Sequence, residues 1–138
     1  MTDKLIGIDF GLSKVGLSIS DPLKIISIPL KVIKYKKREE LLCKLQEIAM
    51  ENNVKSFVIG YPLNMNNKKN EMTKLVDDFF EELKNLNFNV FLQDERLSSE
   101  SAKKIMHEQN IKTGKNKEHI DLISSTIILQ SFLDKGSF

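Results

Sequence analysis

The chain has 138 residues, of which 41% are hydrophobic and 29% are charged, a mixture typical of one folded domain rather than a disordered or membrane protein. Its formal net charge of +2 is too small to indicate a partner, so any basic surface has to be local. Cys43 is the only cysteine, which excludes an intrachain disulfide and a thiol-rich zinc site. Neither a signal region nor a membrane-spanning apolar run is present, so we expect a cytoplasmic protein without a membrane partner.

The chain opens with a predicted antiparallel hairpin, in which strands over residues 4–10 and 14–20 flank a polar turn with glycine at its start. Both faces of the first strand carry apolar residues or glycine except at Asp9, which is typical of a central strand covered on both sides. A carboxylate at the end of such a strand is costly unless it meets a metal, a cation or several donors. Asp9 is therefore either a functional carboxylate or a residue that caps the turn through its backbone.

Residues 25–34 predict a third strand. Pro29 within it cannot donate a ladder hydrogen bond, which favours a position at the edge of the sheet. The segment is also basic, with Lys31 and Lys34 among its charged residues. We interpret these lysines as protection of an edge strand against pairing with other chains.

The middle of the chain alternates helices and strands, which indicates parallel α/β topology. A helix over residues 38–53 precedes a buried strand at Phe57–Gly60, and a strongly amphipathic helix follows over residues 71–86. The loop between the last two carries Asn64 and follows the carboxyl end of a strand, where ligand sites of open α/β sheets lie. Asn64 is a candidate substrate contact, and stabilisation of the loop turn is its structural alternative.

The last predicted strand, residues 88–92, leads directly to Glu95 and Arg96. A further helix follows through about residue 107, then a polar basic loop over residues 110–117. The final helix is predicted over residues 118–134, with Asp121 in its first turn. Taken singly, Glu95 is explained by pairing with Arg96, and Asp121 by the positive end of its helix.

Together, Asp9, Glu95 and Asp121 stand where neighbouring parallel strands end and a helix begins, so we expect them to converge. Oxygen ligands without cysteine or paired histidine suit Mg²⁺ or Mn²⁺. Carboxylates that hold one or two such ions are the apparatus for in-line phosphodiester hydrolysis. We therefore predict that these three residues bind metal and carry catalysis.

Four segments of the sequence resemble motifs of the YqgF/RuvX family: Gly7-Ile8-Asp9-Phe10-Gly11, Gly60-Tyr61-Pro62-Leu63-Asn64-Met65, Asp94-Glu95-Arg96-Leu97-Ser98, and Ile120-Asp121. The resemblance covers nearly the whole chain in order. It implies a ribonuclease H-like fold related to Holliday-junction resolvases, and a candidate nuclease that matures the 5′ end of pre-16S ribosomal RNA. It also maps the acidic residues of the family onto Asp9, Glu95 and Asp121. Two segments depart from the family pattern without removing a metal ligand: Leu12-Ser13 and Glu118-His119.

We accordingly predict one α/β domain over residues 1–138, with a ribonuclease H-like fold, a five-stranded mixed sheet in the order 3-2-1-4-5 and helices on both faces. The expected partners are structured RNA or branched DNA, including ribosomal precursor particles, and the expected state is a monomer or weak homodimer. Arg96 would hold a carboxylate or phosphate bidentately, and lysines would contact backbone phosphates. The predicted substrate-binding residues are Asn64, Arg96, Lys14, Lys112, Lys115 and Lys117.

Three alternatives remain open at the sequence level. The protein could cut branched DNA rather than ribosomal RNA, or it could be a nucleic-acid-binding or ribosome-assembly module that does not cleave. It could also bind a nucleotide through its opening hairpin, as actin-like kinases do. The length weighs against the last alternative, because those proteins need two such lobes.

Overall fold

The structure, a computed structural model, describes residues 4–62, 69–94 and 117–136, with the backbone alone for residues 117–119. The described elements are β1 (Lys4–Asp9), β2 (Lys14–Ser20), β3 (Ser27–Lys34), α1 (Arg38–Asn52), β4 (Val54–Tyr61), α2 (Glu71–Asn85), β5 (Asn89–Asp94) and α4 (Lys117–Lys135). Among these residues, no helix is long and apolar enough to cross a membrane.

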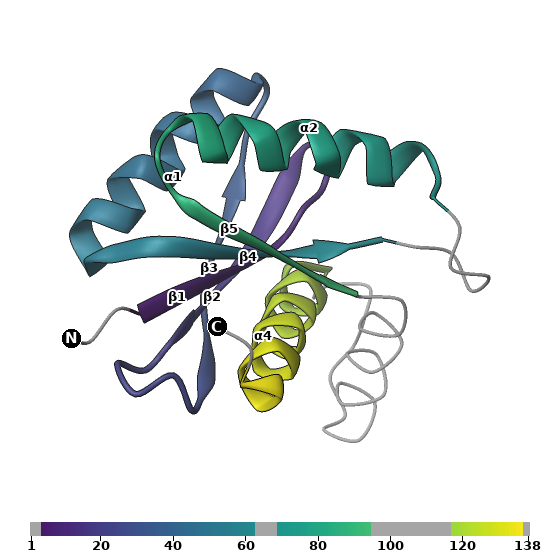
Figure 1. Ribbon diagram of the computed structural model, residues 1–138. Coiled ribbons are helices and arrows are strands. Elements are labelled where there is room, and N and C mark those ends of the chain that lie inside the picture. The colour runs from purple at the N-terminus through teal and green to yellow at the C-terminus, as the bar shows by residue number, and fades with distance from the viewer. Residues whose placement is uncertain (1–3, 63–68, 95–116, 137–138) are drawn as a thin grey trace.

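The five strands form one mixed sheet in the order β3-β2-β1-β4-β5, which confirms the predicted order. The first three strands pair antiparallel, while β1, β4 and β5 pair in parallel. Helices α1 and α2 cover one face of the sheet, and α4 crosses the other face (Figure 1). The carboxyl ends of β1, β4 and β5 therefore meet at the same edge of the sheet.

Alternation along β1 separates two apolar cores. Ile6 and Ile8 are fully buried on the face covered by α1 and α2. Leu5 lies on the opposite face, where it packs with Val58 of β4 and Phe132 of α4. Strand β1 is thus central and covered on both sides, as the sequence predicts.

The two helices on the first face follow their predicted patterns. In α1, the buried side chains recur at helical spacing, and Cys43 lies off this stripe and is exposed. Helix α2 begins with a capping box, in which the Asn70 side chain accepts from the Thr73 backbone N–H at 3.1 Å and Thr73 Oγ1 accepts from the Asn70 backbone N–H at 2.8 Å. The capping box fixes the start of α2, whereas the start of α1 has no side-chain cap.

Several predicted boundaries differ from the observed ones: β4 begins at Val54 rather than Phe57, and β5 ends at Asp94 rather than residue 92. Strand β3 begins at Ser27 rather than residue 25, because Asp21 Oδ1 accepts the backbone N–H groups of Ile25 at 2.7 Å and Ile26 at 2.9 Å. Those residues form a closed loop instead of a sheet ladder. Helix α4 begins at Lys117, so Asp121 lies in its second turn rather than its first. The helix predicted through residue 107 and most of the loop predicted over residues 110–117 lie outside the described residues.

Candidate active site

The candidate site lies at the edge where the parallel strands end. Asp9 is the last residue of β1, and Asp94 is the last residue of β5, where it pairs in register with Tyr61 of β4. Glu95 follows Asp94 directly in the sequence and lies outside the described residues. The topology therefore brings the carboxyl ends of β1 and β5 to one rim of the sheet. The first of these ends carries Asp9, and the second leads in the sequence to Glu95.

Helix α4 approaches this rim through unusually close backbone contacts. Ser125 Oγ donates to the Gly7 carbonyl oxygen at 2.9 Å, and Ser18 Oγ donates to the Ser125 carbonyl oxygen at 2.8 Å. A Cβ atom added to Gly7 would lie 2.5 Å from Ser18 Oγ and 2.8 Å from Leu129 Cβ, which is closer than van der Waals contact. Small residues on β1 and β2 thus allow the helix to lie directly against the sheet.

The same docking brings Asp121 beside Asp9. Gly16 is the register partner of Asp9, and a Cβ atom added to Gly16 would lie 2.4 Å from the Asp121 carbonyl oxygen and 3.1 Å from Asp121 Cβ. Because register partners project from the same face with Cβ atoms about 5 Å apart, the Cβ atoms of Asp9 and Asp121 lie within about 9 Å of each other. Asp9 and Asp121, two of the three predicted metal ligands, therefore lie near each other in the structure.

Helical and strand spacing explain why the two acids meet. From Gly7 to Asp9 the strand advances about 7 Å, and from Ser125 back to Asp121 the helix advances about 6 Å. Since Ser125 contacts Gly7, the matching advance places Asp121 near the end of β1 that carries Asp9. The contact of Ser125 with Gly7, one helical turn away, thus fixes where Asp121 lies relative to β1.

The Asp121 carboxylate is partly buried and lies beside a lysine. The Lys14 ammonium nitrogen lies 3.1 Å from Asp121 Oδ2, with the Asp121 side chain one-quarter exposed. That contact is an ion pair without hydrogen-bond geometry, and Oδ2 itself is buried without any hydrogen-bond partner. A buried carboxylate oxygen is costly unless it accepts from a donor or lies beside a cation, and the Lys14 ammonium group supplies that cation here. The chemistry of the Asp121 carboxylate fits a ligand for a hard divalent cation.

The metal-binding set is incomplete in the described part of the chain. No group of three or more histidine, cysteine or acidic residues that could hold a metal ion occurs within residues 4–62, 69–94 and 117–136. The third predicted ligand, Glu95, lies outside these ranges. Asn64, Arg96, Lys112 and Lys115 also lie outside them, while Lys117 begins α4 with its side chain not described.

A tyrosine that the sequence analysis does not single out braces the turn after Asp9. The Tyr35 hydroxyl donates to the Gly11 carbonyl oxygen, and the Tyr35 backbone N–H donates to the Ser13 carbonyl oxygen at 3.0 Å. Burial raises the pKa of the Tyr35 hydroxyl above its ordinary value of 10.0. The hairpin that follows Asp9 is therefore held from the β3 side of the sheet.

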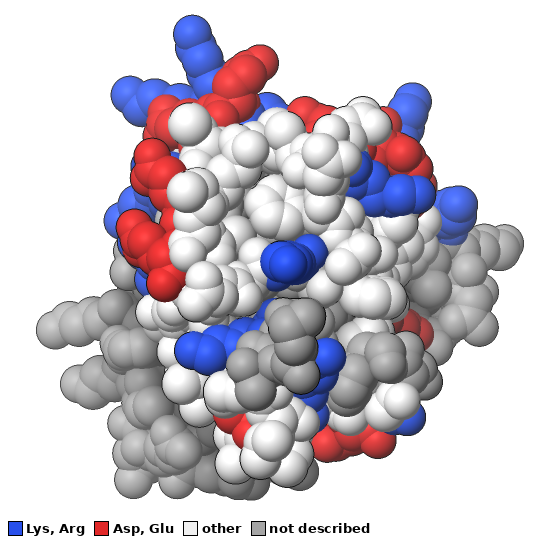
Figure 2. All heavy atoms as spheres, turned by 60° about the vertical axis from the view of Figure 1, so that its left-hand side comes forward, with Lys and Arg blue, Asp and Glu red and all other residues white. Residues whose placement is uncertain are grey.

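The opposite end of the sheet has a different surface character. Figure 2 shows a broad area of uncharged residues on the side of the molecule that carries the amino ends of β1 and β4, with basic atoms near its centre and charged atoms of both signs at its margins. A cavity of about 600 Å³ at this end is lined by Ala49, Met50, Val54 and Phe88 among others.

Comparison with known proteins agrees with this architecture. The RuvX family model, described as "Holliday junction resolvase", matches residues 3–135. A relative from Ruminiclostridium cellulolyticum, named "Putative pre-16S rRNA nuclease", is 39% identical over 96% of this chain and 94% of its own length. A relative of the same name from Mycoplasmopsis synoviae is also 39% identical, over 94% of this chain and 96% of its own.

The structure of T. thermophilus RuvC in complex with a Holliday junction substrate is similar in fold. It aligns with a TM-score of 0.58 over 98% of this chain and 96% of that chain, at 9% sequence identity. Similarity at this level identifies the fold, which is the ribonuclease H-like fold that the sequence predicts. With a family match over nearly its entire length and close relatives of equal size, the chain belongs to the RuvX family.

Proposed function

We propose that the protein is a metal-dependent nuclease that processes the 5′ end of pre-16S ribosomal RNA. The observation that carries this proposal is the meeting of Asp9 and Asp121 at Gly16, at the carboxyl end of β1. The names of the relatives from Ruminiclostridium cellulolyticum and Mycoplasmopsis synoviae supply the substrate class.

In this proposal, Asp9, Asp121 and Glu95 hold Mg²⁺ or Mn²⁺. When bound, such an ion activates water and stabilises the charge that develops on the phosphate oxygens. The chain contributes a fixed separation of carboxylates, because the close contact of α4 with Gly7 and Gly16 leaves the helix little freedom to shift.

The remaining predicted residues act on the substrate. Arg96 binds a phosphate bidentately, and Asn64 reaches the substrate from the loop after β4. Phosphate contacts of this kind position a nucleic acid without reading its sequence. The lysines with this role are Lys14, Lys112, Lys115 and Lys117. We place the protein in the cytoplasm, on ribosomal precursor particles, as a monomer or weak homodimer.

A second candidate function is cleavage of branched DNA. It is favoured by the description of the family model and by the fold similarity to a resolvase bound to a Holliday junction. A module that binds nucleic acid without cleavage is the third candidate.

A substrate panel tests these candidates. Wild type and Asp121→Asn are incubated with a ribosomal precursor RNA that carries the 5′ extension and with a four-way DNA junction, each in Mn²⁺ or in EDTA. We expect Mn²⁺-dependent cleavage of the RNA by wild type and loss of cleavage in the variant. Cleavage of the junction alone would favour the second candidate. Binding without cleavage of either substrate would favour the third.

A further inference from the structure

Gln93, the residue before the end of β5, has a buried amide side chain. Only 6% of the residue is exposed, and its side-chain oxygen Oε1 has no hydrogen-bond partner in the part of the chain that the structure describes. A buried amide oxygen without a donor or a cation is costly, so folded proteins contain few of them. This oxygen is therefore a candidate for contact with a ligand from outside the chain.

Gln93 lies on the same face of the sheet as Asp9. The Phe91 ring packs against Phe132 of α4, with the ring centroids 5.2 Å apart, and Gln93 shares the face of Phe91 because strand side chains alternate. On β1, Leu5 belongs to the same core, and alternation places Asp9 on the face of Leu5. Both polar residues therefore stand on the α4 face, where their strands reach the rim of the sheet.

A glycine separates the two residues across the sheet. Gly60 of β4 is the register partner of Gln93 on β5. The parallel register of β1 with β4 at Ile8 continues by one residue, which places Asp9 on the other side of Gly60. Neighbouring strands lie about 4.8 Å apart, so the Cα atoms of Asp9 and Gln93 are separated by about 10 Å. Gly60 has no side chain to fill the space between them.

The separation suits a single cation. Oxygen ligands lie about 2.1 Å from Mg²⁺, so an ion between two of them spans about 4 Å of the distance, and the side chains of Asp9 and Gln93 are long enough to cover the rest. Gln93 also approaches Asp9 from the side opposite Asp121, which lies against Gly16 on β2. An amide oxygen adds a ligand without negative charge, so it does not increase the repulsion between neighbouring carboxylates.

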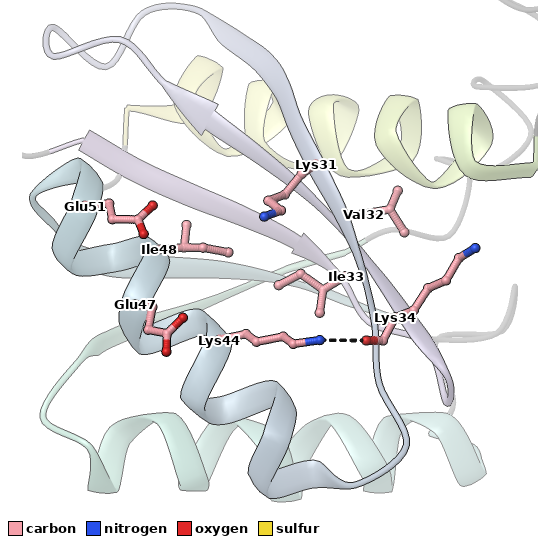
Figure 3. A pocket seen from close by; sticks show the side chains of 8 residues that line it. All are labelled: Lys31, Val32, Ile33, Lys34, Lys44, Glu47, Ile48 and Glu51. Carbon is pink, nitrogen blue, oxygen red and sulfur yellow. Dashed lines mark hydrogen bonds between the residues drawn. The ribbon is translucent and has the colours of Figure 1, made fainter.

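A cavity with acidic side chains elsewhere on the sheet is a weaker candidate for a cation. It has a volume of about 430 Å³ and lies between β3 and α1. Its charged lining residues are Glu47, Glu51, Lys31 and Lys44 (Figure 3). The two lysines bring positive charge to the carboxylates of that cavity, whereas Gln93 Oε1 has no donor among the described residues.

We propose that Gln93 Oε1 is a further, neutral ligand of the divalent cation that Asp9 holds. This inference rests on the proposed function and adds an oxygen from β5 to the carboxylates. Glutamine amide oxygens are among the ligands of hard divalent cations. Because Gln93 is 94% buried, its oxygen is suited to contact with a single ion rather than with a nucleotide.

Gln93→Met tests this assignment, because methionine is also unbranched and flexible but has no oxygen. Binding of Mn²⁺ is measured without RNA, from the electron paramagnetic resonance signal of the free ion during a titration. Loss of a partner outside the direct ligands already weakens metal binding by about 10–100-fold, so we expect the Mn²⁺ dissociation constant of Gln93→Met to rise by at least about 10-fold. In EDTA the variant should melt at or above the wild-type temperature, because it no longer buries an unsatisfied oxygen.

Three further variants complete the comparison. Leu92→Met places a methionine on the same strand but on the opposite face, and it should bind Mn²⁺ as wild type does. Gln93→Glu keeps an oxygen at the same position and adds a negative charge, so it should bind Mn²⁺ more tightly than wild type. Asp9→Asn should bind Mn²⁺ more weakly, because it loses a charged ligand of the proposed site.

Wild-type Mn²⁺ affinity in Gln93→Met, or an equal loss in Leu92→Met, would overturn the assignment of Gln93. If Asp9→Asn loses affinity while Gln93→Met does not, Gln93 is not a ligand and the proposed function stands. If wild type does not bind Mn²⁺, the assignment and the proposed function fail together. If Gln93→Met does not fold, tighter binding by Gln93→Glu supports the assignment, and equal or weaker binding overturns it.

Discussion

Replacement of Gly16 by alanine tests whether close packing of α4 positions Asp121. The added Cβ atom would lie 2.4 Å from the Asp121 carbonyl oxygen, 2.7 Å from its carbonyl carbon and 3.1 Å from its Cβ. Ordinary contact begins near 3.4 Å, so the start of the helix has to move by about 1 Å. The obstacle is helix backbone rather than the tip of a flexible side chain, and overpacking of this kind typically costs about 1–3 kcal/mol of folding free energy.

The displacement should affect the reaction more than the stability. A misplacement of about 1 Å between catalytic groups can lower a rate by on the order of 100-fold. Single-turnover cleavage of the precursor RNA in Mn²⁺ measures the rate, and urea unfolding defines conditions in which the variant remains folded. We expect Gly16→Ala to bind RNA nearly as well as wild type and to cleave it about 100-fold more slowly.

Ile48→Val in α1 is the matched control, because it removes one methyl group from the buried core on the face of the sheet opposite α4, at a typical cost of about 0.5–1.5 kcal/mol. It should lower the free energy of unfolding by a similar amount but retain more activity. Wild-type cleavage by Gly16→Ala, or equal losses of cleavage in both variants, would refute the positioning argument.

Two further predictions concern loops at the two ends of the sheet, the turn after Asp9 and the loop after β2. Tyr35→Phe removes the donor to the Gly11 carbonyl oxygen and should lower the free energy of unfolding by about 1 kcal/mol in urea denaturation near neutral pH. Because burial raises the pKa of Tyr35, its stabilisation is present below about pH 10 and declines as pH rises through the folded-state pKa, a dependence that Tyr35→Phe should lose. The backbone N–H groups of Ile26 and Ile25 lower the pKa of Asp21 below its ordinary value of 3.8, so its contribution is present above that pH and is lost as pH falls through the folded-state pKa. Melting temperatures measured in acid should fall less steeply for Asp21→Asn than for wild type, and parallel curves would contradict this.

Periodicity and proline placement were sufficient to predict most of the fold. Pro29 indicated the edge position of β3, and the doubly apolar pattern of β1 indicated its central place. Both signals are local, because strand alternation and the missing proline donor do not depend on distant contacts. Boundaries failed where a side chain competed with the backbone, as Asp21 does for the N–H groups of Ile25 and Ile26.

The candidate site was less predictable than the fold. Strand-end placement suggested that Asp9 and Asp121 converge, but the means of convergence depends on contacts more than 100 residues apart in the chain, such as Ser18 with Ser125. Small residues on β1, β2 and α4 allow the close approach of the helix to the sheet. They can be recognised as a contact only once the register of β1 with β2 is known.

Thermal melting in Mn²⁺ and in EDTA tests the central claim that Asp9 belongs to a metal-binding carboxylate site. A ligand at about 100 times its Kd stabilises the folded state by roughly 2.7 kcal/mol, which corresponds to a shift of several degrees in the melting temperature of a domain of this size. Wild type and the surface control Asp78→Asn should show this shift, because Asp78 is exposed on α2. Asp9→Asn should lose most of the shift while melting in EDTA at or slightly above the wild-type temperature. Equal Mn²⁺ shifts in wild type and Asp9→Asn would contradict the account.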